Sequence, residues 1–228
     1  MIAKEILQQI GRLKGLKTAE HVYIDYLLDK LMYVIFTLWD NMVLGGGTCI
    51  NRFYGCPRFS RDLDIYSKKK INMQLVVDQL LREGFSVELS KGIEREFLPY
   101  YFKIKIWGET IIIKIDLMFS IPDDYTMVTY ESTYPDIPPF SVNILNITTL
   151  LREKIKALLS DSRWKVADAY DIYFICRKYR VDWKKFCKSD EINEVKERAS
   201  YLIKRDWKIL RDILLEDIDQ DTILRCFK

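Results

Sequence analysis

The sequence predicts a mixed α/β or α+β fold with a helical C-terminal subdomain. Apolar and polar residues alternate in several short segments between residues 85 and 119, which is typical of strands. Apolar residues three and four positions apart dominate both ends of the chain, which is typical of helices. The change between these patterns lies near Pro139 to Asn146. We therefore expect residues 1–142 to form N-terminal helices and a sheet core, and residues 143–228 a helical subdomain.

Length and composition indicate a globular protein. The chain has 228 residues, of which 49% are hydrophobic, with 9 Gly and 6 Pro, so it can bury a full core. Charged residues are scattered through the first helical segment, unlike in a signal peptide. The most apolar stretch, Tyr33 to Trp39, is too short to span a bilayer. We expect a cytoplasmic protein without a membrane segment.

The first part of the chain opens with two predicted helices, at about residues 3–14 and 18–41. The stretch "NMVLGGG" then predicts a short strand entering a glycine turn, "TCINRFYG" one or two helical turns, and "DLDIYS" another strand. A helix follows in "INMQLVVDQLLREG", where Gly84 fits the position after the helix end.

Three more strands are predicted at about Phe85–Ser90, Tyr100–Trp107 and Thr110–Phe119. The "WGET" turn between the last two favours an antiparallel hairpin. Past the connection "YPDIPPF" we expect helices almost to the end of the chain.

Cysteine content and charge give weaker indications. Five cysteines without a CxxC pair or zinc-like spacing favour reduced packing residues. The formal net charge is only +3, but Leu150 to Asp212 holds 17 Lys and Arg against 11 Asp and Glu. This local excess fits a nucleic-acid surface and a solvated helical surface equally well.

Three aspartates are candidate metal ligands. Side chains alternate faces along a strand, so Asp62 and Asp64 lie on one face. Asp116 is a single acid in the apolar strand "TIIIKIDLMFS", where an uncompensated carboxylate is costly to bury. If these strands are neighbours, the three acids converge into a two-metal Mg²⁺ site. For the first two acids alone, solvation at an exposed strand end is the alternative.

The glycine turn is a candidate phosphate site. Gly45, Gly46, Gly47 and Thr48 stand between a predicted strand and a predicted helix, where backbone N–H groups bind phosphate. The stretch is neither a Walker loop nor a GxGxxG motif, so it indicates little without the nearby acids.

These motifs together resemble the AbiEii nucleotidyltransferase-like toxins, including the MenT group, within the polymerase-β-type nucleotidyltransferase superfamily. The resemblance rests on "GGGT", "RFSRDLD", "KID", "LLREK" and "RWKVADAYD", which span about Gly45 to Asp171. It implies a nucleotidyltransferase-fold mixed sheet flanked by helices, with a C-terminal subdomain that completes the active site. By motif, Arg58 and Ser60 join the glycine element in binding an NTP, Asp62, Asp64 and Asp116 hold Mg²⁺, and Lys154 binds phosphate. The last motif offers Asp168 or Asp171. We assign Asp168 to catalysis and keep Asp171 as a nucleotide-binding candidate.

The resemblance also implies a biological role. It is that of a toxin in a toxin–antitoxin or phage-defence pair, which moves a nucleoside monophosphate from an NTP to an acceptor hydroxyl. The tRNA acceptor end is the candidate substrate, and a cognate antitoxin the candidate protein partner. Two alternatives remain open: modification of a small molecule or a protein, and a catalytically silent nucleotide- or RNA-binding module. For Lys154 the alternative is a solvated surface ion pair with Glu153.

Overall fold

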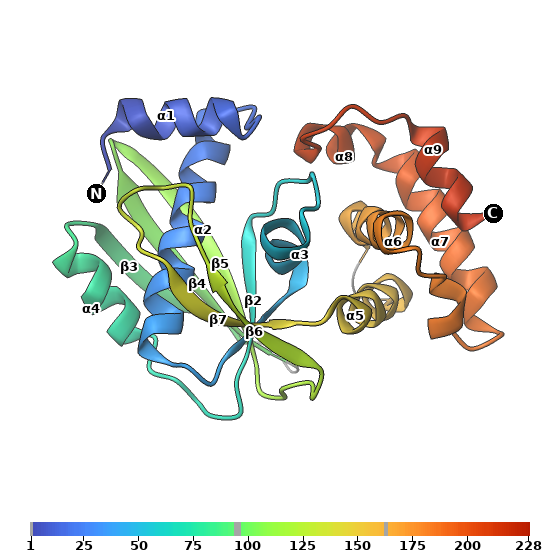
Figure 1. Cartoon of the computed structure of the whole chain (residues 1–228), viewed down its shortest axis with the longest axis horizontal. Helices are drawn as coiled ribbons and strands as arrows, with labels where there is room; N and C mark the ends of the chain where they lie inside the picture. Colours follow the sequence, from blue (N-terminus) through green and yellow to red (C-terminus); the bar gives the residue numbers. More distant parts are fainter. Residues whose placement is uncertain (1, 94–96, 162–163) are drawn as a thin grey trace. The chain divides into compact units, whose positions relative to one another are not determined.

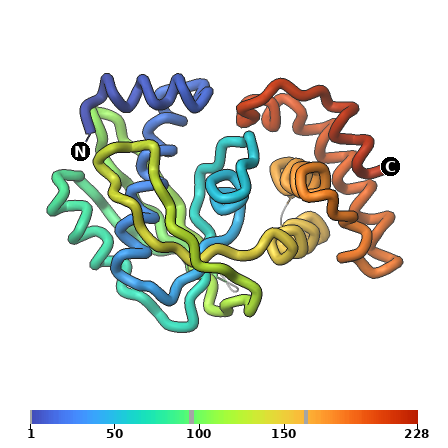
Figure 2. Tube along the Cα trace, in the orientation of Figure 1, coloured from blue at the N-terminus to red at the C-terminus, as the bar shows by residue number. Residues whose placement is uncertain are grey.

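The computed structural model describes residues 2–93, 97–161 and 164–228. The chain divides into two units. We call residues up to Cys49 together with Phe59–Leu145 the sheet unit, and Ile50–Arg58 together with Asn146–Lys228 the helical unit. The chain therefore enters the helical unit for nine residues before completing the sheet unit, a path that Figure 2 traces. The sequence placed a single boundary between residues 142 and 143, without this excursion.

A mixed sheet forms the centre of the sheet unit (Figure 1). Within the described residues it has seven strands in the order β3-β4-β5-β2-β1-β7-β6. The pairs β2–β5 and β1–β7 are parallel, and the other neighbouring pairs are antiparallel. The mixed α/β class predicted from the sequence is confirmed. The strands are β1 (Val43–Gly45), β2 (Asp62–Tyr66), β3 (Ser86–Lys91), β4 (Phe97–Ile106), β5 (Glu109–Met118), β6 (Tyr125–Tyr130) and β7 (Phe140–Leu145).

Helix α2 (Ala19–Leu38) provides much of the core beside the sheet. The side chain of Thr18 caps its start by accepting a hydrogen bond from the N–H of His21 at 3.1 Å. The helix is apolar on most of its circumference, as expected for a helix buried on several sides. It packs against β5 and β7, with α1 (Lys4–Leu13) and α4 (Gln74–Arg82) as further neighbours (Figure 1).

The hairpin of β4 and β5 turns where the sequence predicted. Trp107 and Gly108 both have positive φ, at 44° and 87°, which is the pattern of a type I′ turn. This turn suits the right-handed twist of the two strands and fixes their register, with Ile106 opposite Glu109. The register matters because it places Asp116 on a defined face of β5.

Two strands were not predicted from the sequence. The sequence analysis ended the sheet at about Phe119 and treated "YPDIPPF" as a connection into helices, but β6 and β7 lie in this region. In β7, Phe140, Val142 and Ile144 are buried while Ser141 is exposed. This alternation is the strand signal that the neighbouring prolines obscured. The helices begin only at α5 (Ile147–Leu159).

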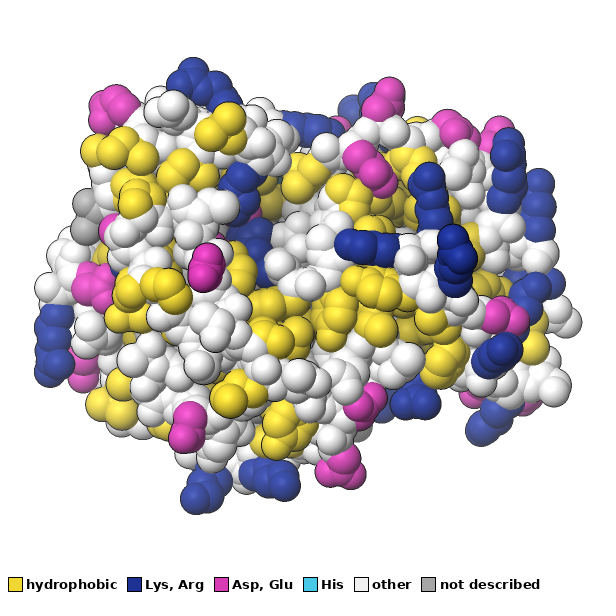
Figure 3. All heavy atoms as spheres, viewed as in Figure 1, with side chains coloured by type: hydrophobic (Ala, Val, Ile, Leu, Met, Phe, Trp, Pro, Cys, Tyr) yellow, Lys and Arg dark blue, Asp and Glu magenta, His cyan; other side chains and the backbone are white. Residues whose placement is uncertain are grey.

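The helical unit is built around α5, α6 (Val166–Tyr179) and α7 (Glu191–Arg205). Tyr170, Tyr173 and Phe174 of α6 are buried in its core. Shorter segments complete the unit: η1 (Trp183–Phe186), α8 (Trp207–Ile213), α9 (Gln220–Leu224) and η2 (Arg225–Phe227). Lys and Arg side chains are numerous on its visible face (Figure 3).

Helix α3 (Gly46–Tyr54) contains the point where the chain leaves the sheet unit, between Cys49 and Ile50. None of the five cysteines forms a disulfide bond in the described residues, and Cys49 and Cys56 are buried. Among the helices described, none has the length and apolar character needed to cross a membrane.

Candidate functional site

The strand order brings the three predicted acids together in the sheet unit. Strand β2 is the parallel neighbour of β5, with Asp64 opposite Asp116 and Asp62 opposite Lys114. The two-residue spacing within each strand places all four side chains on one face. We call Asp62, Asp64, Asp116 and Lys114 the acid face. The strand pairing that the three-acid hypothesis required is therefore present.

Asp116 is the most buried carboxylate of the acid face, with 9% of its surface exposed. Its Oδ2 accepts a hydrogen bond from Lys114 Nζ at 2.8 Å. Its Oδ1 is buried and has no hydrogen-bond partner within the described part of the chain. Burial raises the pKa of Asp116, Lys114 opposes the rise, and the nearby Asp64 and Asp62 add to it. The acid face thus holds more negative charge than Lys114 balances.

Lys114 was named from the sequence only as part of the "KID" motif, without a role. Its ammonium group lies 5.0 Å from the centre of the Phe97 ring. Burial alone would lower its pKa, but Asp116 and Asp62 raise the pKa overall. The strand alternation that pointed to Asp116 also places Lys114 beside it, so this signal was available in the sequence.

The glycine element lies directly behind Asp64. Gly46 has φ +66°, and a Cβ atom there would overlap the carboxylate of Asp64. At Gly45 a Cβ atom would lie 2.7 Å from the Tyr66 ring. Strand β1 ends at Gly45 and α3 begins at Gly46, so the strand runs straight into the helix. The glycines are required for this close packing, and the N-terminus of α3 lies at the acid face.

The other residues of the first motif have distinct places. Thr48 is fully buried, and its hydroxyl donates a hydrogen bond to the backbone carbonyl of Asp62 at 2.6 Å, which ties α3 to β2. Gly47 is also buried. Ser60 is half-buried and lies two residues before the start of β2.

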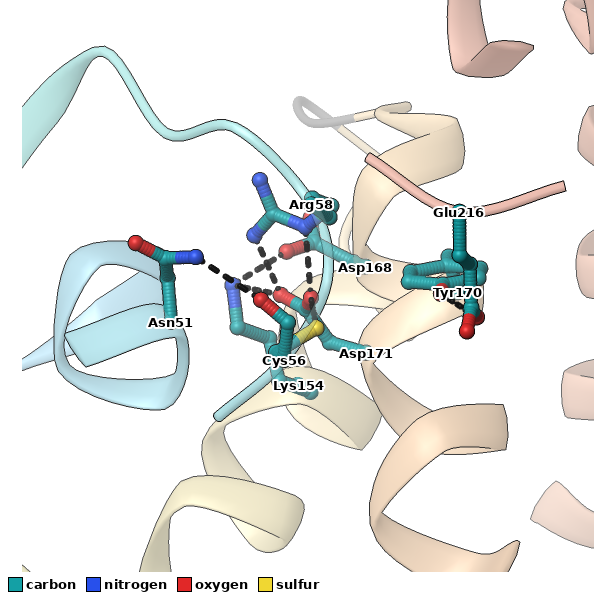
Figure 4. Close-up of polar contacts among 8 residues, drawn as sticks. All are labelled: Asn51, Cys56, Arg58, Lys154, Asp168, Tyr170, Asp171 and Glu216. Atoms are coloured by element: carbon teal, nitrogen blue, oxygen red, sulfur yellow. Dashed lines mark hydrogen bonds and ion pairs between the residues drawn. The ribbon is translucent and has the colours of Figure 1, made fainter. Parts of the chain in front are cut away.

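The remaining predicted residues form a separate cluster in the helical unit. We call Arg58, Lys154, Asp168 and Asp171 the ion cluster (Figure 4). Lys154 Nζ lies 2.8 Å from Asp168 Oδ1 and 2.8 Å from Asp171 Oδ2. Only 5% of Lys154 is exposed, so it is not a solvated surface lysine. The i, i+3 spacing of the two aspartates places both on the side of α6 that contacts Lys154.

Arg58 binds Asp171 with two parallel hydrogen bonds. Its Nε and Nη2 atoms each lie 2.7 Å from a carboxylate oxygen of Asp171. Asp171 is fully buried, and two cations, Arg58 and Lys154, balance its charge inside the protein. Burial lowers the pKa of Arg58, but the Asp171 carboxylate more than offsets this and raises it. The sequence assigned Arg58 and Asp171 to the nucleotide and did not predict that they bind each other.

The segment before Arg58 is anchored within the helical unit. Asn51 donates to the backbone carbonyl of Cys56 at 2.7 Å, and the Leu215 N–H donates to that of Pro57 at 2.8 Å. Cys56 Sγ lies 4.0 Å from Asp171. Tyr170 donates a hydrogen bond to Glu216 at 2.7 Å, which holds the chain after α8 against α6 (Figure 4). Arg163, part of the last motif, lies outside the described residues.

The acid face has the donor set of a magnesium site. Carboxylate oxygens are the ligands that Mg²⁺ prefers, and the unpartnered Oδ1 of Asp116 is suited to a cation. With the side chains as they lie here, the described residues contain no group of three Asp, Glu, His or Cys side chains close enough to hold a metal ion. Lys114 supplies the only positive charge that we assign to the acid face.

Solved structures identify the class of fold. A proposed nucleotidyltransferase of Helicobacter pylori is similar with a TM-score of 0.63 and 19% identity, covering 92% of this chain and 93% of the other. JHP933 of Helicobacter pylori has a TM-score of 0.61 and 18% identity, covering 92% of this chain and 90% of its own. The sheet with two neighbouring acidic strands thus belongs to the nucleotidyltransferase fold. No curated protein matches the sequence.

A family model that matches most of the chain shows which family the protein belongs to. The model of the family described as nucleotidyl transferase AbiEii toxin, type IV toxin–antitoxin system, matches residues 30–223. The chain belongs to this family, so the resemblance stated from the motifs is confirmed. Membership implies a nucleotide substrate and an antitoxin partner.

Proposed function

We propose that the protein transfers a nucleoside monophosphate from an NTP to an acceptor hydroxyl, and that this hydroxyl belongs to the acceptor end of a tRNA. The observation that carries the proposal is the acid face, where three carboxylates on adjacent parallel strands are accompanied by one lysine. Such excess negative charge is unfavourable without a ligand, because like charges repel and the charged form of a buried acid is disfavoured.

The chemistry that we assign to the acid face depends on a hard cation. Asp62, Asp64 and Asp116 would hold Mg²⁺, which neutralises phosphate charge and activates the acceptor hydroxyl. Asp116 completes the set and assists deprotonation of the acceptor hydroxyl. The backbone N–H groups at the start of α3 and the hydroxyl of Ser60 bind the phosphate tail. Gly46 keeps Asp64 in place because no larger residue fits beside it.

In the helical unit we assign Lys154 to binding phosphate as pyrophosphate departs. Its ammonium group is held by Asp168 and Asp171 at 2.8 Å each. Arg58 in turn holds Asp171, so we treat Arg58 and Asp171 as positioning residues. The basic surface of this unit supports a polyanionic acceptor, because Lys and Arg exceed Asp and Glu between Leu150 and Asp212.

Label transfer tests the proposed reaction. The protein is incubated with Mg²⁺, total RNA and each α-labelled NTP in turn, and we expect label on RNA of tRNA size. Asp64→Asn should abolish labelling, with a loss of roughly 100-fold or more, because it removes one charge at nearly constant shape. Asp123→Asn, an exposed acid outside the acid face, is the matched control and should label normally.

The alternative functions are separate outcomes of the same assay. Label on a protein or on a small molecule would replace the tRNA part of the proposal. NTP binding with no label on any acceptor would favour a silent nucleotide-binding module and contradict the catalytic part.

Lys154→Ala tests the helical-unit assignment. We expect turnover to fall by roughly tenfold or more, because charge is lost where it is needed as pyrophosphate departs. Lys165→Ala, an exposed lysine of the same unit, should leave turnover unchanged. Circular dichroism must show that the Lys154→Ala protein is folded, and full turnover in a folded variant would contradict the assignment.

A further inference from the structure

Strand β6 is an open edge of the sheet. Among the described strands it pairs with β7 alone, so its other side ends the sheet. Its sequence, "YTMVTY", contains no charge and no proline. Exposure is high at Met127 (69%) and Tyr125 (44%). Proteins commonly protect an exposed edge with lysines, prolines or bulges, because it otherwise pairs with other chains. An unprotected edge of this kind suits strand addition.

The edge strand is rigidly held. All six of its residues are in register with β7, from Tyr125 opposite Leu145 to Tyr130 opposite Phe140. The Tyr130 hydroxyl donates to the buried Asp29 at 2.9 Å. Ser132, just after the strand, donates to the same carboxylate at 2.7 Å. A partner strand would therefore meet a preorganised edge and lose little entropy in ordering it.

The chain segment that contains β6 carries only negative charges. No Lys or Arg occurs from Ile115 to Leu151, a stretch that includes five Asp and Glu. Asp123 and Asp124 precede the strand, and Glu131 follows it. Figure 3 shows mainly hydrophobic and uncharged atoms over the area that Figure 1 labels β6 and β7. The edge is thus an uncharged centre between two acidic ends.

The same charges oppose pairing between two copies of this chain. The antiparallel register that pairs all six residues places Met127 opposite Val128 of the other copy. It also places Asp124 opposite Glu131 at both ends. Like charges directly opposite each other on adjacent strands are destabilising. A strand with cations at these end positions is favoured instead.

A groove beside the edge offers room for a side chain of the partner. It measures about 380 Å³ and lies within the sheet unit, between the end of α2 and the β6–β7 hairpin. Its lining includes Tyr33, Phe36, Met127, Pro139 and Asp40. The lining is mostly apolar with one exposed acid, which suits an apolar side chain close to a cation.

We propose that β6 is a docking edge for another protein, which adds an extended, uncharged segment flanked by Lys or Arg on both sides. Main-chain hydrogen bonds to β6 supply affinity, and the cations beside Asp123, Asp124 and Glu131 supply register and selectivity. The proposal does not depend on the nucleotidyltransferase reaction.

Two synthetic peptides test this surface: Lys-Lys-Thr-Val-Thr-Val-Thr-Val-Lys-Lys, and the same core with Glu in place of each Lys. Fluorescence anisotropy should show the basic peptide binding at least roughly tenfold more tightly than the acidic one, because only it complements the flanks. Hydrogen exchange should slow at the amides of residues 125–130 when the basic peptide is bound.

Met127→Lys places a charge on the exposed centre of the edge. It should weaken binding of the basic peptide by roughly tenfold, while the circular dichroism spectrum stays unchanged. Ile209→Lys, a change at a similarly exposed apolar residue of the helical unit (61%), should have no effect. Glu131→Lys should weaken binding of the basic peptide and strengthen binding of the acidic peptide.

Equal binding of both peptides, protection away from residues 125–130, or full binding by Met127→Lys would overturn the proposal. So would a wild-type dimer in analytical ultracentrifugation that Met127→Lys dissociates, since a second copy would then be the occupant.

Discussion

The acid face and the ion cluster use the same kinds of side chain in opposite ways. The acid face has three carboxylates and one lysine on strands, with Asp62 and Asp64 partly exposed. The ion cluster has two carboxylates and two cations on and near helices, all of them buried. The acid face thus has three carboxylates for one lysine, whereas the ion cluster has as many cations as carboxylates.

The difference indicates what each group is for. A buried, charge-balanced cluster positions the elements that carry it, here together with the ammonium group of Lys154, and the loss of one member is strongly destabilising. A partly exposed group with surplus charge gains from a ligand of opposite charge. A motif residue is thus better interpreted by its charge balance and burial than by its residue type alone.

The largest expected effect follows from breaking the ion cluster. Arg58→Ala should lower the free energy of unfolding by about 3–5 kcal/mol, because it removes one of the two cations that Asp171 binds in the interior. Urea titration measures this loss. Arg61→Ala is the control: this exposed arginine pairs with exposed Glu20, and its removal should change the free energy of unfolding by less than about 1 kcal/mol. If both variants lost a similar free energy of unfolding, the contrast between a buried ion pair and an exposed one would be contradicted.

The next effect tests the packing behind the acid face. Gly46→Ala places a side chain at φ +66° and against the carboxylate of Asp64. We expect a loss of about 1–2 kcal/mol from the backbone alone, together with a loss of nucleotidyl transfer as Asp64 is displaced. Gly84→Ala has φ +88° and nothing within 4 Å, so it should lose stability without losing activity. Full activity of Gly46→Ala would show that nucleotidyl transfer does not require Asp64 in this position.

Adding Mg²⁺ should stabilise the protein through the acid face and not through the ion cluster, by a smaller free energy than the losses above. Mg²⁺ at ten times its dissociation constant should stabilise the protein by about 1.4 kcal/mol, seen as a rise in melting temperature that EDTA reverses. Asp64→Asn should lose this response. Arg58→Lys, altered in the ion cluster, should keep it if folded. A magnesium response that survives in Asp64→Asn would place the cation elsewhere.

The last effect concerns pH and the thiol beside Asp171, and it is absent near neutral pH. Burial, and then the Asp171 carboxylate, raises the pKa of Cys56 above its ordinary value of 9.0. The folded protein therefore holds this proton more tightly than the unfolded chain, and stability falls as pH rises above about 9. Wild-type protein should lose up to about 1.4 kcal/mol per pH unit more than Cys56→Ala in this window. Parallel pH profiles in urea titrations would refute this.

Much of the sheet unit followed from local patterns. Alternation along two strands placed Asp62, Asp64 and Asp116, and the spacing of apolar residues identified the long helices, because both signals lie within a few neighbouring residues. The missed strands β6 and β7 show the limit of this approach. Three prolines near the start of β7 are a strong turn signal, and they obscured the alternation of Phe140, Val142 and Ile144.

The ion cluster could be predicted only by analogy. Its motif residues were named from the family resemblance, but the pairing of Arg58 with Asp171 joins residues 113 positions apart. No local period relates such residues, since their contact depends on tertiary structure. For the same reason the sequence did not show that residues 50–58 belong to the helical unit.

The separation between Arg58 and Asp171 also bears on how the protein is made. A ribosome adding about 5–20 residues per second delivers Asp171 roughly 6 to 23 seconds after Arg58. All seven described strands end by Leu145, so the sheet can assemble on the nascent chain before Asp171 has been made. During this time the guanidinium group of Arg58 is solvated by water and has not yet formed its ion pair with Asp171. Residues 146–228 synthesised alone would bury Asp168 and Asp171 without that arginine. The helical unit is therefore expected to fold only once residues 146–228 have been made, on a chain that already carries residues 50–58.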